Sequence, residues 1–235
     1  MEEYQHPPTF RSTGDLAADF RHSLEDYDVN AAPLLPEDHS ARIVDVGCGW
    51  GQFLWWLGSR GYTRAEGIDT GAEQVRYCQS LGLRAEHVAD SAAFLRDRPA
   101  QYDLITMNHI IEHVDGPAGL ELLRAAHGSL RPGGRVMVQT PNMNATSASY
   151  ARYVEMTHVT GYTDNSLGEA LYMAGFVNVR VVGNKTKLRL APRRVLWLML
   201  QFASRLLWRA MLLAELGSDA PRILSKNLYA VADRA

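Results

Sequence analysis

The sequence is poor in cysteine and almost neutral in charge. Only two cysteines, Cys48 and Cys78, occur among its 235 residues. One lies in a glycine-rich motif and the other in a predicted helix, which excludes a fold held by disulfides. The formal net charge of −2 argues against a general nucleic-acid-binding protein. The first ten residues, MEEYQHPPTF, are acidic and polar and do not resemble a signal peptide, so we expect a cytoplasmic protein.

One long stretch contains no acidic residue at all. From Ala170 to Ala214 there is no Asp or Glu, and the basic residues there give a local charge of +8. These residues are Arg180, Lys185, Lys187, Arg189, Arg193, Arg194, Arg205 and Arg209. The asymmetry favours contact with an anionic partner, either a membrane surface or a phosphorylated acceptor.

Short apolar runs alternate with helical patterns along most of the chain. Strands are predicted over 42–46, 64–69, 83–90, 102–108, 135–140, 176–182 and 225–232, and helices over 51–61, 71–82, 117–130 and 163–175. This alternation predicts an α/β fold with a Rossmann-like, mostly parallel sheet and helices on both faces. We expect an N-terminal helical arm over 1–40 and one domain over 41–235, with a basic amphipathic insertion at about 184–224.

The first strand runs into a loop with glycine at three alternate positions, Gly47, Gly49 and Gly51. Such a loop permits a tight turn and lets a ligand approach the backbone at the carboxyl edge of the sheet. The dinucleotide fingerprint G-x-G-x-x-G is missing, because Gln52 and Leu54 stand where its last glycine would be. The loop therefore predicts a ligand without a pyrophosphate group.

Acidic residues end the next two predicted strands. Asp69 follows Gly47 by 22 residues, a position from which a carboxylate can accept both ribose hydroxyl protons. Asp90 ends the third strand and can accept from an exocyclic amine, while the Ser91 amide can donate to a ring nitrogen. Taken together with the glycine loop, these residues predict a nucleoside-like ligand.

The motifs VDVGCGWG, GID, VAD, YDLITMNHIIEHV, LRPGGRVMVQTPN and LYMAGF occur in this order over residues 42–182. In this the sequence resembles the class I S-adenosylmethionine-dependent methyltransferases. The resemblance implies a seven-stranded sheet that ends in an antiparallel hairpin, and S-adenosylmethionine as cofactor. It implies that the donor is bound by Asp45, Gly47, Cys48, Gly49, Gly51, Asp69, Asp90, Ser91, Asn108 and His109.

The block His109-Ile110-Ile111-Glu112-His113 follows the fourth strand. Two imidazoles and a carboxylate on one helical face could bind a divalent metal. Some ubiquinone-biosynthesis O-methyltransferases, which this segment resembles, carry E-x-x-E-H there, and His109 replaces the first acid. We expect no metal, and interpret the block as an acid and a histidine that fix the loop beside the cofactor.

A long polar and aromatic segment, residues 140–162, follows the fifth strand. Irregular segments at this edge of a sheet commonly carry substrate contacts. Because its side chain titrates near neutral pH, His158 is predicted as the general base, with Glu155 and His109 as further catalytic candidates. The segment also loosely resembles methyltransferases from bacterial polysaccharide and lipopolysaccharide gene clusters.

Residues 193–214 are basic and strongly apolar. Arg194, Gln201, Arg205 and Arg209 are spaced by seven, four and four residues, which places them on one narrow helical stripe. Three interpretations are open. The helix packs on its own core or in a homodimer, lies on an anionic membrane surface, or covers a bulky acceptor.

The sequence as a whole predicts an S-adenosylmethionine-dependent O-methyltransferase acting on a sugar hydroxyl of a bacterial cell-surface glycan or its precursor. The alternative acceptor is a small hydroxylated molecule, such as a quinone precursor or secondary metabolite. A noncatalytic cofactor-binding scaffold is the third hypothesis. We expect no nucleic-acid partner, and a cytoplasmic protein that associates peripherally with the inner membrane face if the helix binds lipid.

Overall fold

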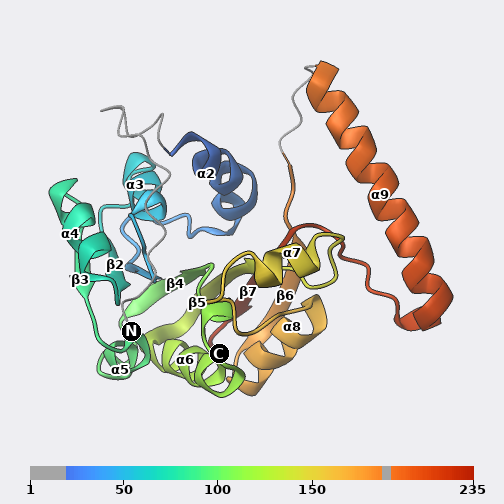
Figure 1. Cartoon of the computed structure of the whole chain (residues 1–235). Helices are drawn as coiled ribbons and strands as arrows, with labels where there is room; N and C mark the ends of the chain where they lie inside the picture. The colour runs from blue at the N-terminus through green and yellow to red at the C-terminus, as the bar shows by residue number, and fades with distance from the viewer. Residues whose placement is uncertain (1–19, 187–191) are drawn as a thin grey trace.

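A computed structural model describes residues 20–186 and 192–235 (Figure 1). Its centre is one seven-stranded sheet of order β3-β2-β1-β4-β5-β7-β6. The strands are β1 (Ile43–Val46), β2 (Ala65–Asp69), β3 (Ala85–His87), β4 (Tyr102–Asn108), β5 (Leu130–Pro141), β6 (Val177–Gly183) and β7 (Asn227–Asp233). Strands β1 to β5 pair in parallel, and β7 runs antiparallel between β5 and β6. This confirms the predicted Rossmann-like sheet and its final antiparallel hairpin.

Helices cover both faces of the sheet. The α-helices are α2 (Arg21–Asp26), α3 (Gln52–Ser59), α4 (Ala72–Ser80), α5 (Ser91–Arg96), α6 (Gly116–Ser129), α7 (Ala148–Tyr153), α8 (Asp164–Met173) and α9 (Pro192–Leu216). Shorter turns are η1 (Tyr27–Ala31), η2 (Ala32–Leu34), η3 (Ile111–His113) and η4 (Gly217–Asp219). The expected helices at 51–61, 71–82, 117–130 and 163–175 correspond to α3, α4, α6 and α8.

The alternation of side chains along β1 divides the core into two layers. Ile43 packs with α3 and the N-terminal turns, whereas the next residue, Val44, packs with α5, α6 and α8. Successive side chains of a strand point to opposite faces, so a fully buried strand supplies both layers. All four residues of β1 are buried, which explains its unbroken apolar run apart from Asp45.

The N-terminal segment from Phe20 to Leu34 is docked on the domain. The Tyr27 ring lies 5.0 Å from that of Phe53, and the Trp56 indole N–H donates to Asp28 at 2.9 Å. The Tyr229 hydroxyl on β7 donates to Asp26. These contacts join the described part of the predicted arm to α3 and to the sheet. Residues 1–19 of that arm lie outside the described residues.

Residues 131–134, between the predicted helix 117–130 and the predicted strand 135–140, form a bulge in β5. Tyr102 pairs with Leu130 and Leu104 with Arg135, so the register shifts between these two pairs. Gly133 lies within the bulge at φ 77°, a left-handed conformation that glycine adopts without steric cost. The regular part of the strand starts at Arg135, where the sequence predicts it.

Helix α9 occupies the predicted insertion between β6 and β7. In Figure 1 it stands apart from the layered domain as a long helix at the far side of β6. The loops that follow β1, β2 and β4 lie at the carboxyl edge of the sheet. Because carboxyl ends of parallel strands meet at one edge, these loops come together there.

Candidate active site

The glycine loop after β1 is shaped by close packing. The Gly47 backbone has φ 68°, and its N–H donates to the Ile68 carbonyl at 2.7 Å. A Cβ at this position would lie 1.9 Å from Ile110 Cδ1. The bare backbone therefore lets Ile110, which follows β4, close against the loop. At Gly49, by contrast, a Cβ would have no atom within 4 Å, so its backbone borders open space.

Asp69 at the end of β2 fixes this loop. One carboxylate oxygen accepts from the Gly49 N–H at 2.8 Å, and the other accepts from the Gly71 N–H at 2.7 Å. Each oxygen keeps a second lone pair for a ligand. The predicted ribose-binding carboxylate is thus held in place by the same backbone that borders the open space.

Asp45 is buried beside the loop. It accepts from the Thr106 hydroxyl at 2.7 Å and from the Asn108 side-chain amide at 3.1 Å. Burial raises the pKa of Asp45 to about 7, helped by the nearby charge of Asp69 and opposed by these two hydrogen bonds. The carboxyl group consequently changes charge near neutral pH, and a cation bound beside it would favour the ionised form.

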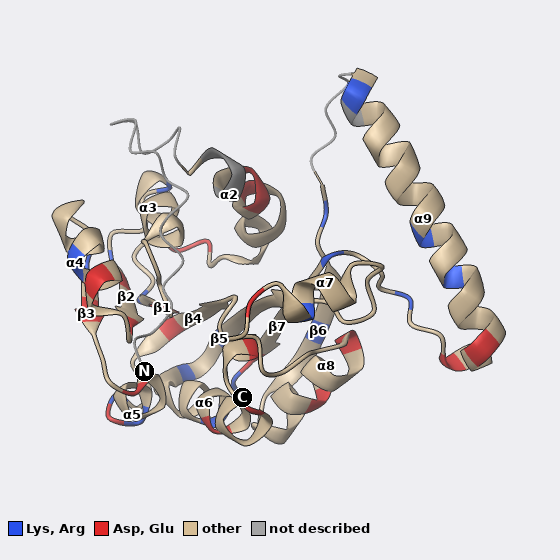
Figure 2. Ribbon diagram, in the orientation of Figure 1, with Lys and Arg blue, Asp and Glu red and all other residues tan. Residues whose placement is uncertain are grey.

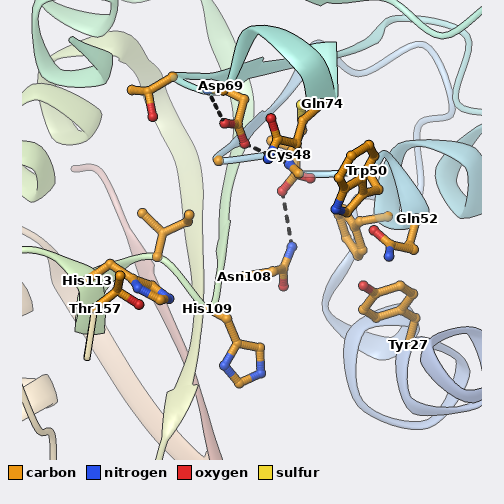
Figure 3. Close-up of a pocket in the computed structure, with 17 residues that line it drawn as sticks. Tyr27, Cys48, Trp50, Gln52, Asp69, Gln74, Asn108, His109, His113 and Thr157 are labelled. Carbon is orange, nitrogen blue, oxygen red and sulfur yellow. Dashed lines mark hydrogen bonds between the residues drawn. The ribbon is translucent and has the colours of Figure 1, made fainter. Parts of the chain in front are cut away.

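These groups open on a cavity of about 450 Å³ (Figure 3). In the view, Tyr27, Trp50 and Gln52 lie on one side of it, and His113 and Thr157 on the other. Of the predicted site residues, the cavity is lined by Asp45, Gly47, Cys48, Gly49, Asp69, Asn108 and His109. The lining is completed by Tyr27, Trp50, Gln52, Phe53, Thr70, Gly71, Gln74, Ile110, His113 and Thr157.

Two acceptors in the cavity lining lack hydrogen-bond partners. Asn108 Oδ1 and Gln74 Oε1 are buried and unpaired in the described part of the chain. Because an unpaired buried acceptor costs free energy, such atoms indicate a ligand that supplies donors. A molecule that carries an ammonium group and a nucleoside fits these two acceptors, the Asp45 and Asp69 carboxylates, and the aromatic walls.

His109 is aimed at the cavity by strained backbone and a buried acid. Its φ of 56° is left-handed, which is uncommon outside glycine and clusters at functional sites. The Nδ1 atom lies 2.8 Å from a Glu112 oxygen, and the Thr140 hydroxyl donates to the other oxygen at 3.0 Å. With Nδ1–H donating to the carboxylate, the neutral ring keeps a lone pair on Nε2, which the Asn227 side-chain amide approaches at 3.5 Å.

Glu112 stays ionised although its side chain is only 3% exposed. Burial raises its pKa, but the His109 hydrogen bond and the charges of His109 and His113 outweigh burial and leave the pKa below its ordinary value. A buried anion of this kind fixes the orientation of the imidazole that it contacts. Glu112 and His109 therefore form a carboxylate–imidazole pair at the cavity wall.

His158 lies behind this wall. It is buried, its Nδ1 atom is 2.6 Å from the Ala151 carbonyl, and its Nε2 atom is 3.0 Å from Glu155. His113, which lines the cavity, lies in front of His158, and the two ring centroids are 4.7 Å apart. Neither His158 nor Glu155 lines the cavity. The general-base role predicted for His158 remains a prediction, and this placement gives it no support.

Asp90 and Ser91 lie at the start of α5, outside the cavity lining. One Asp90 oxygen accepts from the backbone N–H groups of Ala92 and Ala93 and so caps the helix. Gly51 also lies outside the lining, and precedes α3 at φ 82°. The predicted adenine contacts of Asp90 and Ser91 stay predictions.

Three possible metal ligands meet near His158. Among the described residues, atoms of Glu112, His113 and His158 lie within 4.8 Å of one another. Both Glu112 oxygens, however, already accept hydrogen bonds from His109 and Thr140. A metal would compete with these bonds, and the expectation of no metal stays untested.

Several lining residues were not predicted from the sequence. Tyr27 comes from the docked N-terminal segment, Gln74 from α4, and Thr157 from the loop before α8. Tyr27 carries no sequence signal for this role because its docking depends on Phe53 and Trp56 in α3. His113 and Trp50 lie next to predicted site residues, so their proximity to the motifs was the available signal.

The sequence profile of the methyltransferase domain family matches residues 18–181. The chain belongs to this family. The match confirms the resemblance predicted from the glycine loop and the motifs that follow it. It ends within β6, before α9.

Curated relatives include the ubiquinone biosynthesis O-methyltransferase of Aeromonas salmonicida, 35% identical over 114 residues, which are 44% of each chain. The enzyme of that name from Pseudomonas syringae pv. tomato is 32% identical over 115 residues, 47% of this chain and 48% of the relative. The chain therefore matches less than half the length of these relatives.

Solved structures share the fold. A SAM-dependent methyltransferase from Archaeoglobus fulgidus has a TM-score of 0.67 at 19% identity, over 92% of this chain and 97% of that one. Phosphoethanolamine N-methyltransferase 2 of Haemonchus contortus, solved with S-adenosyl-L-methionine, has a TM-score of 0.61 at 16% identity, over 89% and 52% of the chains. At these identities the likeness establishes the fold of this methyltransferase family member.

Proposed function

We propose that this methyltransferase moves the methyl group of S-adenosylmethionine to a hydroxyl oxygen of a small aromatic acceptor. This proposal rests on the position of His109, which is held by Glu112 and lines the same cavity as the glycine loop. The names of the ubiquinone-biosynthesis relatives support a phenolic acceptor of the quinone-precursor class.

Residues of this chain would hold the donor at its two polar ends. Asp45 and the unpaired Asn108 Oδ1 offer acceptors for an ammonium group, and Asp69 offers two oxygens for ribose hydroxyls. The bound donor supplies an activated methyl group on a sulfonium centre. The protein has then to align the acceptor oxygen and keep water away.

His109 Nε2 carries the lone pair that would take the acceptor's proton, in competition with the Asn227 side-chain amide at 3.5 Å. A phenolic hydroxyl has a pKa of about 10, as in tyrosine, and imidazole about 6.5. Proton transfer to His109 during methyl transfer is therefore within the ordinary range of general-base catalysis. A sugar hydroxyl is far less acidic, and the glycan acceptor expected from the sequence has no support from the comparisons.

The test measures formation of S-adenosylhomocysteine with a panel of catechols and hydroxybenzoates, and with sugar nucleotides as the competing class. We expect turnover with the phenols, lost by about 10² or more in His109→Ala, while donor binding by calorimetry persists. His39→Ala, an exposed histidine beside Tyr62, is the matched control. Turnover only with sugars would contradict the phenolic acceptor, and donor binding without turnover on either class would favour the scaffold hypothesis.

A further inference from the structure

Helix α9 turns its apolar side away from the protein. Met199, Leu200, Phe202, Leu206, Leu207 and Met211 are 52–70% exposed. At 100° per residue they spread over half the circumference of the helix, and the one charged residue of α9 in this arc is Arg193, at its edge in the first turn. We call these six residues the apolar face. An exposed surface of this extent on a single helix marks an interaction site.

The polar side of α9 is turned toward the domain. Gln201, Arg205, Trp208 and Arg209 are less exposed than the apolar face, and the Trp208 indole donates to the Asn144 carbonyl at 3.0 Å. A soluble helix that packs on its own domain shows the opposite arrangement, with its apolar stripe inward. The apolar face of α9 is therefore not explained by packing on the domain described.

We infer that α9 docks this protein on the surface of an anionic lipid bilayer, with the apolar face inserted among the acyl chains. The local charge supports lipid over another occupant. Residues 170–214 contain eight basic residues and no acid, and basic residues near a membrane attract anionic headgroups. Figure 2 shows the Lys and Arg positions along α9, with acidic positions only at its far end. This inference does not depend on the proposed acceptor.

The width of the apolar face also favours lipid. Two helices that pack together bury a narrow seam on each partner, whereas a helix in the membrane interface immerses a broad side. Trp197 lies to one side of the apolar face, where an indole suits the headgroup boundary.

Connectivity opposes a helix that crosses the bilayer. The segment Val195–Asp219 is long and apolar enough to span a membrane by length and composition. A single crossing would place β6 and β7 on opposite sides, yet these strands pair directly with each other. The chain after α9 is already tied down at Ile223, whose carbonyl accepts from Asn142 at 2.9 Å. Arg205 and Arg209 would each add a cost of about 3 kcal/mol near the bilayer centre.

The test is flotation of the full chain with vesicles of equimolar phosphatidylcholine and phosphatidylglycerol. We expect flotation with these vesicles, much less with phosphatidylcholine alone, and release by alkaline carbonate. The double variant Met199→Asp/Leu206→Asp should partition about tenfold more weakly or worse, because it removes two apolar side chains from the face. Gln201→Asp/Ser204→Asp adds the same charge outside the apolar face and should keep most of the binding.

Three outcomes would overturn the inference. Equal partitioning of the two double variants would mean that charge alone acts, and resistance to carbonate would indicate a crossing helix. A vesicle-independent dimer in light scattering that Met199→Asp/Leu206→Asp dissociates would show that a second copy covers the face. Donor binding and circular dichroism confirm that each variant is folded.

Discussion

Glu112, a buried anion, holds the Nδ1 atom of His109 at 2.8 Å beside the cavity. This pair joins a residue of the β4 loop to a residue of η3 and leaves the second ring nitrogen, Nε2, 3.5 Å from the Asn227 side-chain amide nitrogen. In the proposed proton transfer, the anion would orient the ring and stabilise the imidazolium that forms. Glu112 is thus a positioning residue for His109.

Glu112→Gln should lower kcat by about tenfold, since a hydrogen bond to a charged group contributes about 1.5 kcal/mol or more. Without the carboxylate charge, protonation of His109 is less favourable, so the acid limb of the pH–rate profile should move to lower pH. KM for the donor should change little. Glu121→Gln, an exposed acid on α6, is the control. An unmoved acid limb would show that Glu112 has only a structural role.

Asp45 predicts a pH dependence of donor binding. Its pKa is about 7, so it is mostly neutral below that pH and cannot attract an ammonium group. Affinity for S-adenosylmethionine should therefore rise as pH increases through about 7 and level off above it. Asp45→Asn should bind more weakly at pH 8 and lack this rise. Calorimetry between pH 6 and 8 measures both, and a rise retained in the variant would assign it to another group.

Asp45 should also lower the stability of the folded protein as pH rises, whereas its effect on donor affinity is a rise with pH. The folded pKa of Asp45 lies above its ordinary value of 3.8, so folding favours the neutral form. Ligand-free protein should lose this part of its stability as pH rises from about 4 to about 7. Asp45→Asn should then raise Tm relative to the wild type at pH 8 more than at pH 5. An equal shift at both pH values would contradict the raised pKa.

Most of the sheet and the glycine loop could be predicted because their signals are local. The buried, mostly apolar run of β1, the glycines after it and Asp69 at the end of β2 can each be recognised within a few residues. The cap of α8 was also predictable, since Thr163 and Ser166 form a capping box. The geometry of the loop around Asp45 and Asp69 follows from these elements.

The features that could not be predicted from the sequence depend on contacts between distant segments. His158 has the residue type of a base, but the 140–162 segment folds so that His158 faces Ala151 and Glu155. Tyr27 reaches the cavity only because α3 provides Phe53 as its partner. The amphipathic pattern of α9 was visible in the sequence, whereas the side that it turns outward required the structure.

Asp90 allows its two possible roles to be separated. It caps α5 with one oxygen, and asparagine caps helices about as well as aspartate. Asp90→Asn should therefore leave Tm nearly unchanged. If the other oxygen accepts from the adenine amine, S-adenosylmethionine should bind about tenfold more weakly, because a charge-assisted hydrogen bond is lost. Calorimetry that finds wild-type affinity would assign Asp90 to capping alone.

The cluster of Glu112, His113 and His158 makes a metal requirement testable. Glu112, His113 and His158 lie close enough to share an ion, but Glu112 and His158 already have other partners. Both Glu112 oxygens accept hydrogen bonds, and His158 Nε2 lies at Glu155. Burial lowers the pKa of His113, opposed by the charges of Glu112 and Glu155, and the neutral ring is also the form that binds a metal, so the expectation rests on the partners of Glu112 and His158. We therefore expect dialysis against a chelator to leave turnover unchanged and added Zn²⁺ or Mg²⁺ to give no increase. Loss of activity on chelation, restored by one of these ions and absent in His113→Ala, would replace the carboxylate–imidazole pair by a metal centre.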